Sequence, residues 1–196
     1  MNSRIQQQQL DFSLKIDASK DVFRRTHLSH HGRRENDAEH AWHMTIMAYL
    51  LKEYANEPVD ISKVMIMCLI HDLVEIEAGD TFAHDEKAKQ SEEEREDAAK
   101  LKVFSSLPED QKNEFISLFD EFTEGNTPEA KFARAMDNLQ PLLLNDSNQG
   151  SDWKENHVTY DKVIKRHEKT LEGSRQIYDV VQEILEKNIQ QGNLKR

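Results

Sequence analysis

The sequence predicts an all-α protein that folds as a single compact helical bundle. Its 196 residues include only six glycines and four prolines, too few for the many turns of a β-sandwich or barrel. Charged residues make up 32% of the chain and hydrophobic residues 37%, a balance typical of amphipathic helices with solvated outer faces. No repeat or linker divides the chain, so we expect one domain over residues 1–196.

Helices are predicted on both sides of a polar loop near the N-terminus. Apolar residues at helical spacing indicate one short helix up to about Asp17 and another from about Ser19. Residues 26–37 are polar, with one glycine and three histidines, and we expect them to form a loop. Asp37 can then cap a long helix that runs without a breaker to about Tyr54.

The segment 61–77 contains VMIMCLI, which is apolar on every side. Periodicity alone would also permit a buried strand. The length of the segment and its many Met and Leu residues favour a central buried helix, which Gly79 ends.

The second half of the chain is predicted to be helical to the end. The expected elements are a charged helix at about 85–103, a helix from Pro108 to Gly125, a helix that begins at Thr127, a loop at 145–152 and two final polar helices. Pro141 should kink or shorten the helix that begins at Thr127, because proline lacks the N–H that a helix needs.

Charge and composition exclude several classes of protein. A formal net charge of −11 argues against binding to nucleic acid or to an anionic membrane. The single cysteine, Cys68, rules out a disulfide framework. There is no signal-like N-terminus and no run of 18 apolar residues. We therefore expect a cytoplasmic protein without nucleic-acid or membrane partners.

A His-Asp pair near the end of the most apolar helix is the first candidate for chemistry. His71 and Asp72 need a partner there, because an unpaired buried charge is costly. A divalent cation would favour both the neutral imidazole and the ionised carboxylate. The alternative is a core histidine beside a carboxylate at a helix terminus. A second such pair, His84-Asp85, shows that the dipeptide alone is a weak signal.

Three further residues strengthen the case for a metal. His40 lies in the first turn of a predicted helix, and Asp137 lies in a helix that is apolar around most of its circumference. Glu75 is one helical turn beyond His71 and should share its face. Two imidazoles and two carboxylates would neutralise a divalent ion and leave coordination positions open, as a hydrolytic site requires.

The order H…HD…D resembles the HD-domain superfamily of metal-dependent phosphohydrolases. The stretches RENDAEH, HDLVEIEAGD and EAKFARAMDNL resemble the subgroup that contains the 5′-deoxynucleotidases, over about residues 10–180. The resemblance implies an HD-domain helical bundle with one divalent transition metal ion (Mn, Co, Fe, Ni or Zn) on His40, His71, Asp72 and Asp137. It also implies a nucleoside 5′-monophosphate substrate, typically a deoxyribonucleotide. Homodimers are common in this subgroup.

Roles for further residues follow from the same resemblance. Glu75 would orient the metal-activated water or carry its proton. Asp80 matches a family carboxylate that assists the leaving group. Arg25 and Arg33 fall where the subgroup places arginines that contact phosphate or close the site.

Three polar residues before His40 are expected to support the site. Glu35, Asn36 and Glu39 could each pair with an arginine or hydrogen-bond to His40.

Other functions remain open from the sequence. The substrate could be another small phosphate ester or a nucleotide polyphosphate. A dinuclear iron site would need more histidines between Asp72 and Asp137, where only His84 lies. A non-catalytic module that binds metal or nucleotide is the alternative from another class, although Glu75 and Asp80 argue against it.

Overall fold

The computed structural model describes residues 3–78 and 92–196, and helices make up most of them, which confirms the predicted all-α class. In chain order the elements are α1 (Ser3–Lys15), the 3-10 helix η1 (Ile16–Asp21), β1 (Phe23–His27), β2 (Arg34–Asn36), α2 (Asp37–Leu51), the 3-10 helix η2 (Lys52–Tyr54), α3 (Ile61–Ile70), α4 (Glu75–Ala78), α6 (Glu92–Phe104), α7 (Glu109–Glu124), α8 (Pro128–Ser147), α9 (Ser151–Glu155), α10 (Tyr160–Gly173) and α11 (Arg175–Gln190).

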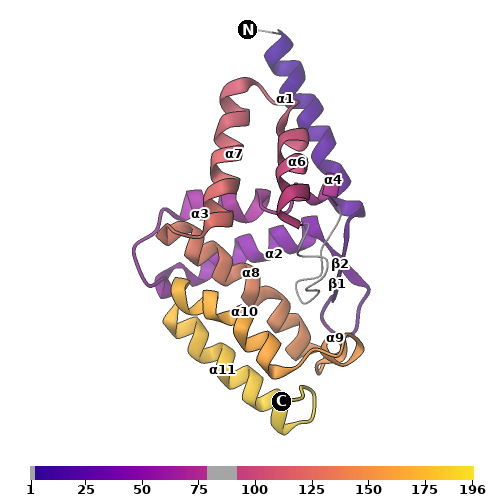
Figure 1. The fold of residues 1–196 in the computed structure, drawn as a ribbon, viewed down its shortest axis with the longest axis vertical. Coiled ribbons are helices and arrows are strands. Elements are labelled where there is room, and N and C mark those ends of the chain that lie inside the picture. Colours follow the sequence, from indigo (N-terminus) through magenta and orange to yellow (C-terminus); the bar gives the residue numbers. More distant parts are fainter. Residues whose placement is uncertain (1–2, 79–91) are drawn as a thin grey trace.

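Helix α8 lies at the centre of the molecule, with α2, α3, α7, α10 and α11 all packed against it (Figure 1). It begins as its sequence predicts, because the Thr127 side chain accepts a hydrogen bond from the Ala130 amide and Pro128 occupies the first turn. Its buried residues face several neighbours at once, which is why a central helix is apolar around most of its circumference.

Two hydrophobic clusters make up the core. The larger lies between α2, α3, α8, α10 and α11. The smaller joins α1, the end of α3, α6 and α7, and its aromatic rings include Phe12 and Phe104, both edge-on to Phe115 at centroid distances of 5.8 and 5.6 Å. Partly buried Leu118 packs against both clusters, so the helices drawn at the top of Figure 1 share packing with those below.

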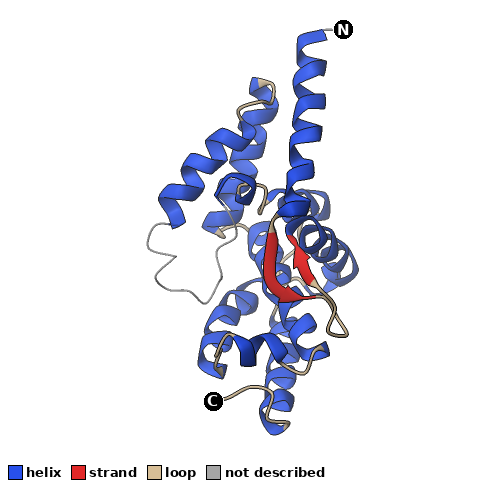
Figure 2. Ribbon diagram, turned by 90° about the vertical axis from the view of Figure 1, so that its right-hand side faces the viewer, coloured by secondary structure: helices blue, strands red, loops and turns tan. Residues whose placement is uncertain are grey.

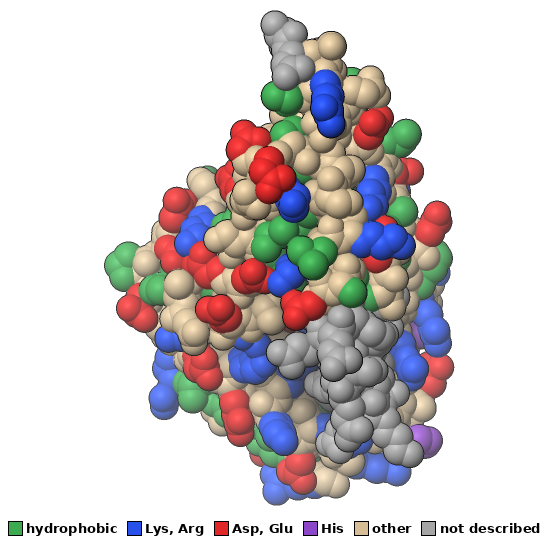
Figure 3. All heavy atoms as spheres, turned by 45° about the horizontal axis from the view of Figure 1, so that its top comes forward, with side chains coloured by type: hydrophobic (Ala, Val, Ile, Leu, Met, Phe, Trp, Pro, Cys, Tyr) green, Lys and Arg blue, Asp and Glu red, His purple; other side chains and the backbone are tan. Residues whose placement is uncertain are grey.

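The outer surface is strongly charged. Acidic and basic side chains are interspersed over the face in Figure 3, with small apolar patches between them, as the composition predicts for solvated helices. Among the described residues, no helix combines the length and the apolar character that crossing a membrane requires.

The predicted loop at 26–37 is confirmed for residues 28–33, but its two ends belong to β1 and β2, which pair as an antiparallel hairpin (Figure 2). The predicted helix from Ser19 is also wrong beyond Asp21, where η1 gives way to β1. The Asp37 amide donates to the Val22 carbonyl and continues the pairing next to the hairpin. Asp152 of α9 then holds β1 through the amide and the ring Nδ1 of His27, at 2.9 and 2.6 Å. Tertiary contacts of this kind stabilise strands whose charged sequence gives no local signal.

Two helix boundaries also differ from the prediction. α3 ends at Ile70, and a turn over residues 71–74 precedes α4, so the expected helix to residue 77 is interrupted. α8 instead continues past Pro141 to Ser147 into the expected loop, so this proline does not shorten the helix. A proline removes one hydrogen bond, and the buried side chains on both sides of Pro141 hold the helix together.

Candidate metal centre

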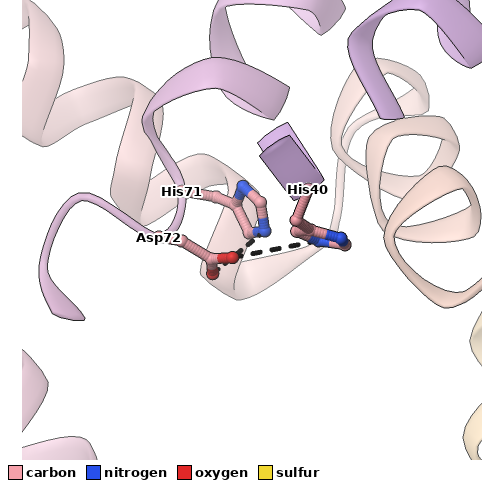
Figure 4. A group of neighbouring side chains, drawn as sticks. All are labelled: His40, His71 and Asp72. Carbon is pink, nitrogen blue, oxygen red and sulfur yellow. Dashed lines mark ion pairs between the residues drawn. The ribbon is translucent and has the colours of Figure 1, made fainter. Parts of the chain in front are cut away.

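His71 and Asp72 lie in the turn after α3, where the chain leaves the core (Figure 4). Asp60 caps the start of α3 by accepting hydrogen bonds from the Ser62 and Lys63 amides. At the other end, Nδ1 of His71 lies 2.9 Å from the Cys68 carbonyl oxygen. A carbonyl can only accept, so Nδ1 carries the proton and Nε2 presents its lone pair to the site.

His40 enters from α2 and is completely buried. Asn36 and Glu39 form a capping box at the start of α2, which fixes His40 one residue further along. Nδ1 of His40 lies 2.9 Å from the side-chain oxygen of Gln140. The Gln140 amide nitrogen in turn donates to Glu35 at 2.6 Å, which orients the amide and leaves Nε2 of His40 as the free acceptor.

Asp137 brings a second carboxylate from α8. Its Oδ1 lies 3.1 Å from Nε2 of His40 and 3.8 Å from Nε2 of His71, while Oδ1 of Asp72 lies 3.0 Å from Nε2 of His71. Ligand atoms of His40, His71 and Asp72 all fall within 4.8 Å of one another. The structure therefore brings together all four residues that the sequence analysis named as ligands.

With both imidazoles neutral in these tautomers, the four side chains present only acceptors to one another. Among the described residues, buried Nε2 of His71 has no hydrogen-bond partner of good geometry, although Asp72 lies beside it. Burial lowers the pKa of His71, but the charges of Asp72 and Asp137 outweigh it and raise that pKa to about 10. The cluster thus attracts a cation strongly. Mixed imidazole and carboxylate donors suit a divalent transition metal, so these residues fit the implied ion.

Two arginines that the sequence analysis did not select lie on the carboxylates. Nη1 of Arg24 is 2.6 Å from Oδ2 of Asp72 and 3.4 Å from Asp37. Nη2 of Arg166, from α10, is 3.4 Å from Oδ2 of Asp137. Burial opposes the charge on Arg24, but the surrounding carboxylates, Asp72 foremost, raise its pKa above the ordinary value.

The predicted phosphate-binding arginines lie further from the cluster. Arg25 follows Arg24 on β1, so the two side chains point to opposite faces of the hairpin, and Arg25 donates to Asn156 at 3.3 Å. Arg33 is more than half exposed and pairs with Glu39, with Nη1 2.8 Å from Oε2. Their contact with a substrate stays a prediction.

Of the two predicted catalytic carboxylates, Glu75 and Asp80, only Glu75 lies among the described residues. Glu75 is the first residue of α4, and its charge is among those that raise the pKa of Arg24, so its carboxylate lies near that arginine. Asp80 lies outside the described residues, so its predicted role stays a prediction.

Glu35 and Gln140 form the support behind His40. Glu35 is only 1% exposed, and burial raises the pKa of its carboxyl to about 7, against the opposing effects of Arg24 and the hydrogen bond from Gln140. Gln140 follows Asp137 by three residues in the same helix. That spacing, with a polar side chain in an apolar helix, is the sequence signal that could have revealed Gln140.

The chain belongs to the HD-domain family. A family model described as an HD domain matches residues 16–178, which is most of the chain. This match confirms the family that the order of histidines and aspartates indicated.

The chain is also similar to a solved structure and to several curated proteins. The chain is 43% identical to a crystal structure described as a predicted metal-dependent phosphohydrolase from Magnetospirillum magnetotacticum MS-1, with a TM-score of 0.94 over 98% of this chain and 96% of that one. It is 28% identical over 111 residues to the 5′-deoxynucleotidase HDDC2 of Homo sapiens, and the match spans about half of each chain, 57% of this one and 53% of that one. The Dictyostelium discoideum protein of the same name is 28% identical over 136 residues, which cover 66% of this chain and 72% of that one.

Proposed function

We propose that this protein is a metal-dependent phosphohydrolase that removes the phosphate from (deoxy)nucleoside 5′-monophosphates. The observation that carries the proposal is the gathering of four side chains from three separate segments, with both imidazole tautomers fixed so that each Nε2 lies within 3.8 Å of two carboxylates. Such a cluster needs a cation. The substrate class rests on the names of the curated relatives, each a 5′-deoxynucleotidase.

His40, His71, Asp72 and Asp137 would hold the ion. A divalent metal at this position polarises a phosphate oxygen and lowers the pKa of a bound water. Mn, Co, Fe, Ni and Zn all suit these ligands, and which of them serves depends on availability.

Glu75 would accept the proton of the attacking water, because its charge is close to Arg24, which contacts the ligand Asp72. The water oxygen bonds to phosphorus, the bond from phosphorus to the 5′ oxygen breaks, and the nucleoside leaves with a proton. Asp80 is the proposed source of that proton.

We also propose that the chain works as a homodimer. Exposed apolar side chains lie at helical spacing on α2, at Trp42, Ile46, Tyr49 and Leu50, and α3, which packs against α2, exposes Leu69. A stripe of this kind is typical of a surface that another protein covers. A single domain over residues 1–196 and a cytoplasmic location complete the proposal.

Phosphate release from a panel of nucleotides tests the enzyme directly. The panel holds deoxyribo- and ribonucleoside 5′-monophosphates, triphosphates and an aryl phosphate, assayed after chelation and after return of Mn, Co, Zn or Mg. We expect metal-restored release from the monophosphates, abolished by Asp72→Ala and reduced by Glu75→Gln, with the exposed Lys165→Gln as control.

Three other results would change the conclusion. Release from triphosphates or the aryl phosphate alone would replace the substrate class. Nucleotide-induced thermal stabilisation of the metal-loaded protein without any release would indicate a binding module. If no nucleotide in the panel releases phosphate and none stabilises the protein, the proposal is refuted.

A further inference from the structure

Arg166 is held firmly beside the metal centre by a buried neighbour. Its Nε donates to Oδ1 of Asn138 at 2.6 Å, and Asn138 returns a hydrogen bond from Nδ2 to the Arg166 carbonyl at 3.4 Å. Asn138 is only 5% exposed and follows Asp137 directly in α8. The guanidinium is therefore fixed in place before any ligand arrives, which lowers the entropic cost of binding one.

Most of the hydrogen-bonding capacity of this guanidinium is unused. Nε is taken by Asn138, and Nη2 approaches Oδ2 of Asp137 at 3.4 Å. Within residues 3–78 and 97–196, no other side chain or carbonyl accepts a hydrogen bond from it. The side chain is 27% exposed, so its remaining N–H groups are open to a ligand at the edge of the centre.

Arg166 and Arg24 form a matched pair. Each lies near Oδ2 of one carboxylate, Arg24 near Asp72 at 2.6 Å and Arg166 near Asp137 at 3.4 Å, and they come from different elements, the hairpin and α10. A divalent ion would cancel the charges of Asp72 and Asp137. The two guanidiniums would then supply positive charge to attract a phosphate dianion to a protein whose net charge is −11.

We propose that Arg166 binds a phosphoryl oxygen of the substrate beside the metal centre, a role that rests on the proposed function. The alternative role that the same contacts suit is that Arg166 only orients Asp137 as a metal ligand. The two roles predict different changes. Loss of a phosphate ligand weakens phosphate binding at full metal occupancy, whereas loss of an orienting residue weakens the binding of the metal.

Titration of the metal-loaded protein with inorganic phosphate, followed by calorimetry, separates these roles. We expect Arg166→Gln to weaken phosphate binding about 10- to 100-fold, since one or two charge-assisted hydrogen bonds are lost. Metal affinity, measured by competition with a chelator, should not fall. Arg166→Lys should recover only part of the phosphate affinity, because lysine keeps the charge but lacks the planar guanidinium that can donate two parallel hydrogen bonds. Lys165→Gln removes an exposed charge one residue away on α10 and should leave both affinities unchanged.

Several results would overturn the inference. Wild-type phosphate affinity in Arg166→Gln would do so, whether or not its metal affinity falls. If Arg166→Gln does not retain metal, Arg166→Lys decides at full metal occupancy: weaker phosphate binding supports the inference and wild-type binding overturns it.

The same titrations distinguish this inference from the proposed function. If the wild-type protein binds phosphate through Arg166 but releases no phosphate from the nucleotide panel, the inference stands and the proposed function is refuted. If the wild-type protein hydrolyses nucleotides and Arg166→Gln binds phosphate with wild-type affinity, the proposed function stands and the inference is refuted.

Discussion

Gln140 links the metal centre to the core of the protein, and its replacement by leucine tests the whole support behind His40. Gln140 is completely buried in α8. Its oxygen accepts from Nδ1 of His40 at 2.9 Å, and its nitrogen donates to Glu35 at 2.6 Å and lies 3.1 Å from Nδ1 of His43. Leucine has a similar size but can make none of these contacts, so Gln140→Leu removes them without opening a large cavity.

The expected loss can be estimated from the groups left behind. A buried donor or acceptor without a partner costs about 1–3 kcal/mol, and Gln140→Leu leaves the Nδ1 proton of His40 and the Glu35 carboxyl in that state. We therefore expect the free energy of unfolding of the metal-free protein to fall by about 2–6 kcal/mol. Because His40 also loses its fixed tautomer, metal affinity should fall by about 10- to 100-fold.

Urea unfolding of the metal-free protein and chelator competition with the folded protein measure these two effects separately. Gln182→Leu, the same substitution at an exposed position of α11, is the control and should change neither. A loss of stability below about 1 kcal/mol together with wild-type metal affinity would refute the argument, since it would mean that His40 keeps its orientation without Gln140.

Three more predictions concern the fold. Gly173→Ala should destabilise the protein by about 1–3 kcal/mol in urea unfolding, because a Cβ there would collide with the backbone carbonyl of Lys131 and push α10 away from α8; wild-type stability would contradict this close approach. Glu121 accepts hydrogen bonds from Lys63 and Thr127, which lower its pKa below the ordinary 4.5 although burial opposes them. Glu121→Gln should therefore cost about 1 kcal/mol at pH 7, and the difference should vanish as the pH falls through the depressed pKa; a pH-independent difference would count against the ion pair. Burial raises the pKa of the Cys68 thiol, so it should react with a disulfide reagent only after unfolding, and rapid reaction of the native protein would show that α3 is not packed as described.

The long helices could be predicted because their signals are local. The Thr127 cap, Pro128 in the first turn and the Gly125 stop lie within a few residues of the ends of α7 and α8, and the structure has both helices there. The hairpin of β1 and β2 could not be predicted this way. Its strands are short and charged, and their pairing depends on contacts with α9, more than a hundred residues away.

At the metal centre, too, some residues could be predicted from the sequence and others could not. The order of histidines and aspartates named four residues that the structure brings together from α2, the turn after α3, and α8. The sequence alone could not decide between Arg24 and Arg25. Neighbouring residues of a strand point to opposite faces, and this segment was not predicted to be a strand. Arg166 reaches Asp137 from 29 residues along the chain, and no local pattern encodes that contact.

Titration of the metal-free protein with Co²⁺ tests the central claim most directly, with phosphate release from a deoxynucleoside 5′-monophosphate measured after each addition. We expect no phosphate release without metal and a rise that reaches its plateau at one equivalent of ion per chain, with Asp137→Ala inactive at that ratio. Full activity in the metal-free protein, or a plateau that requires two ions per chain, would contradict a single metal centre formed by His40, His71, Asp72 and Asp137.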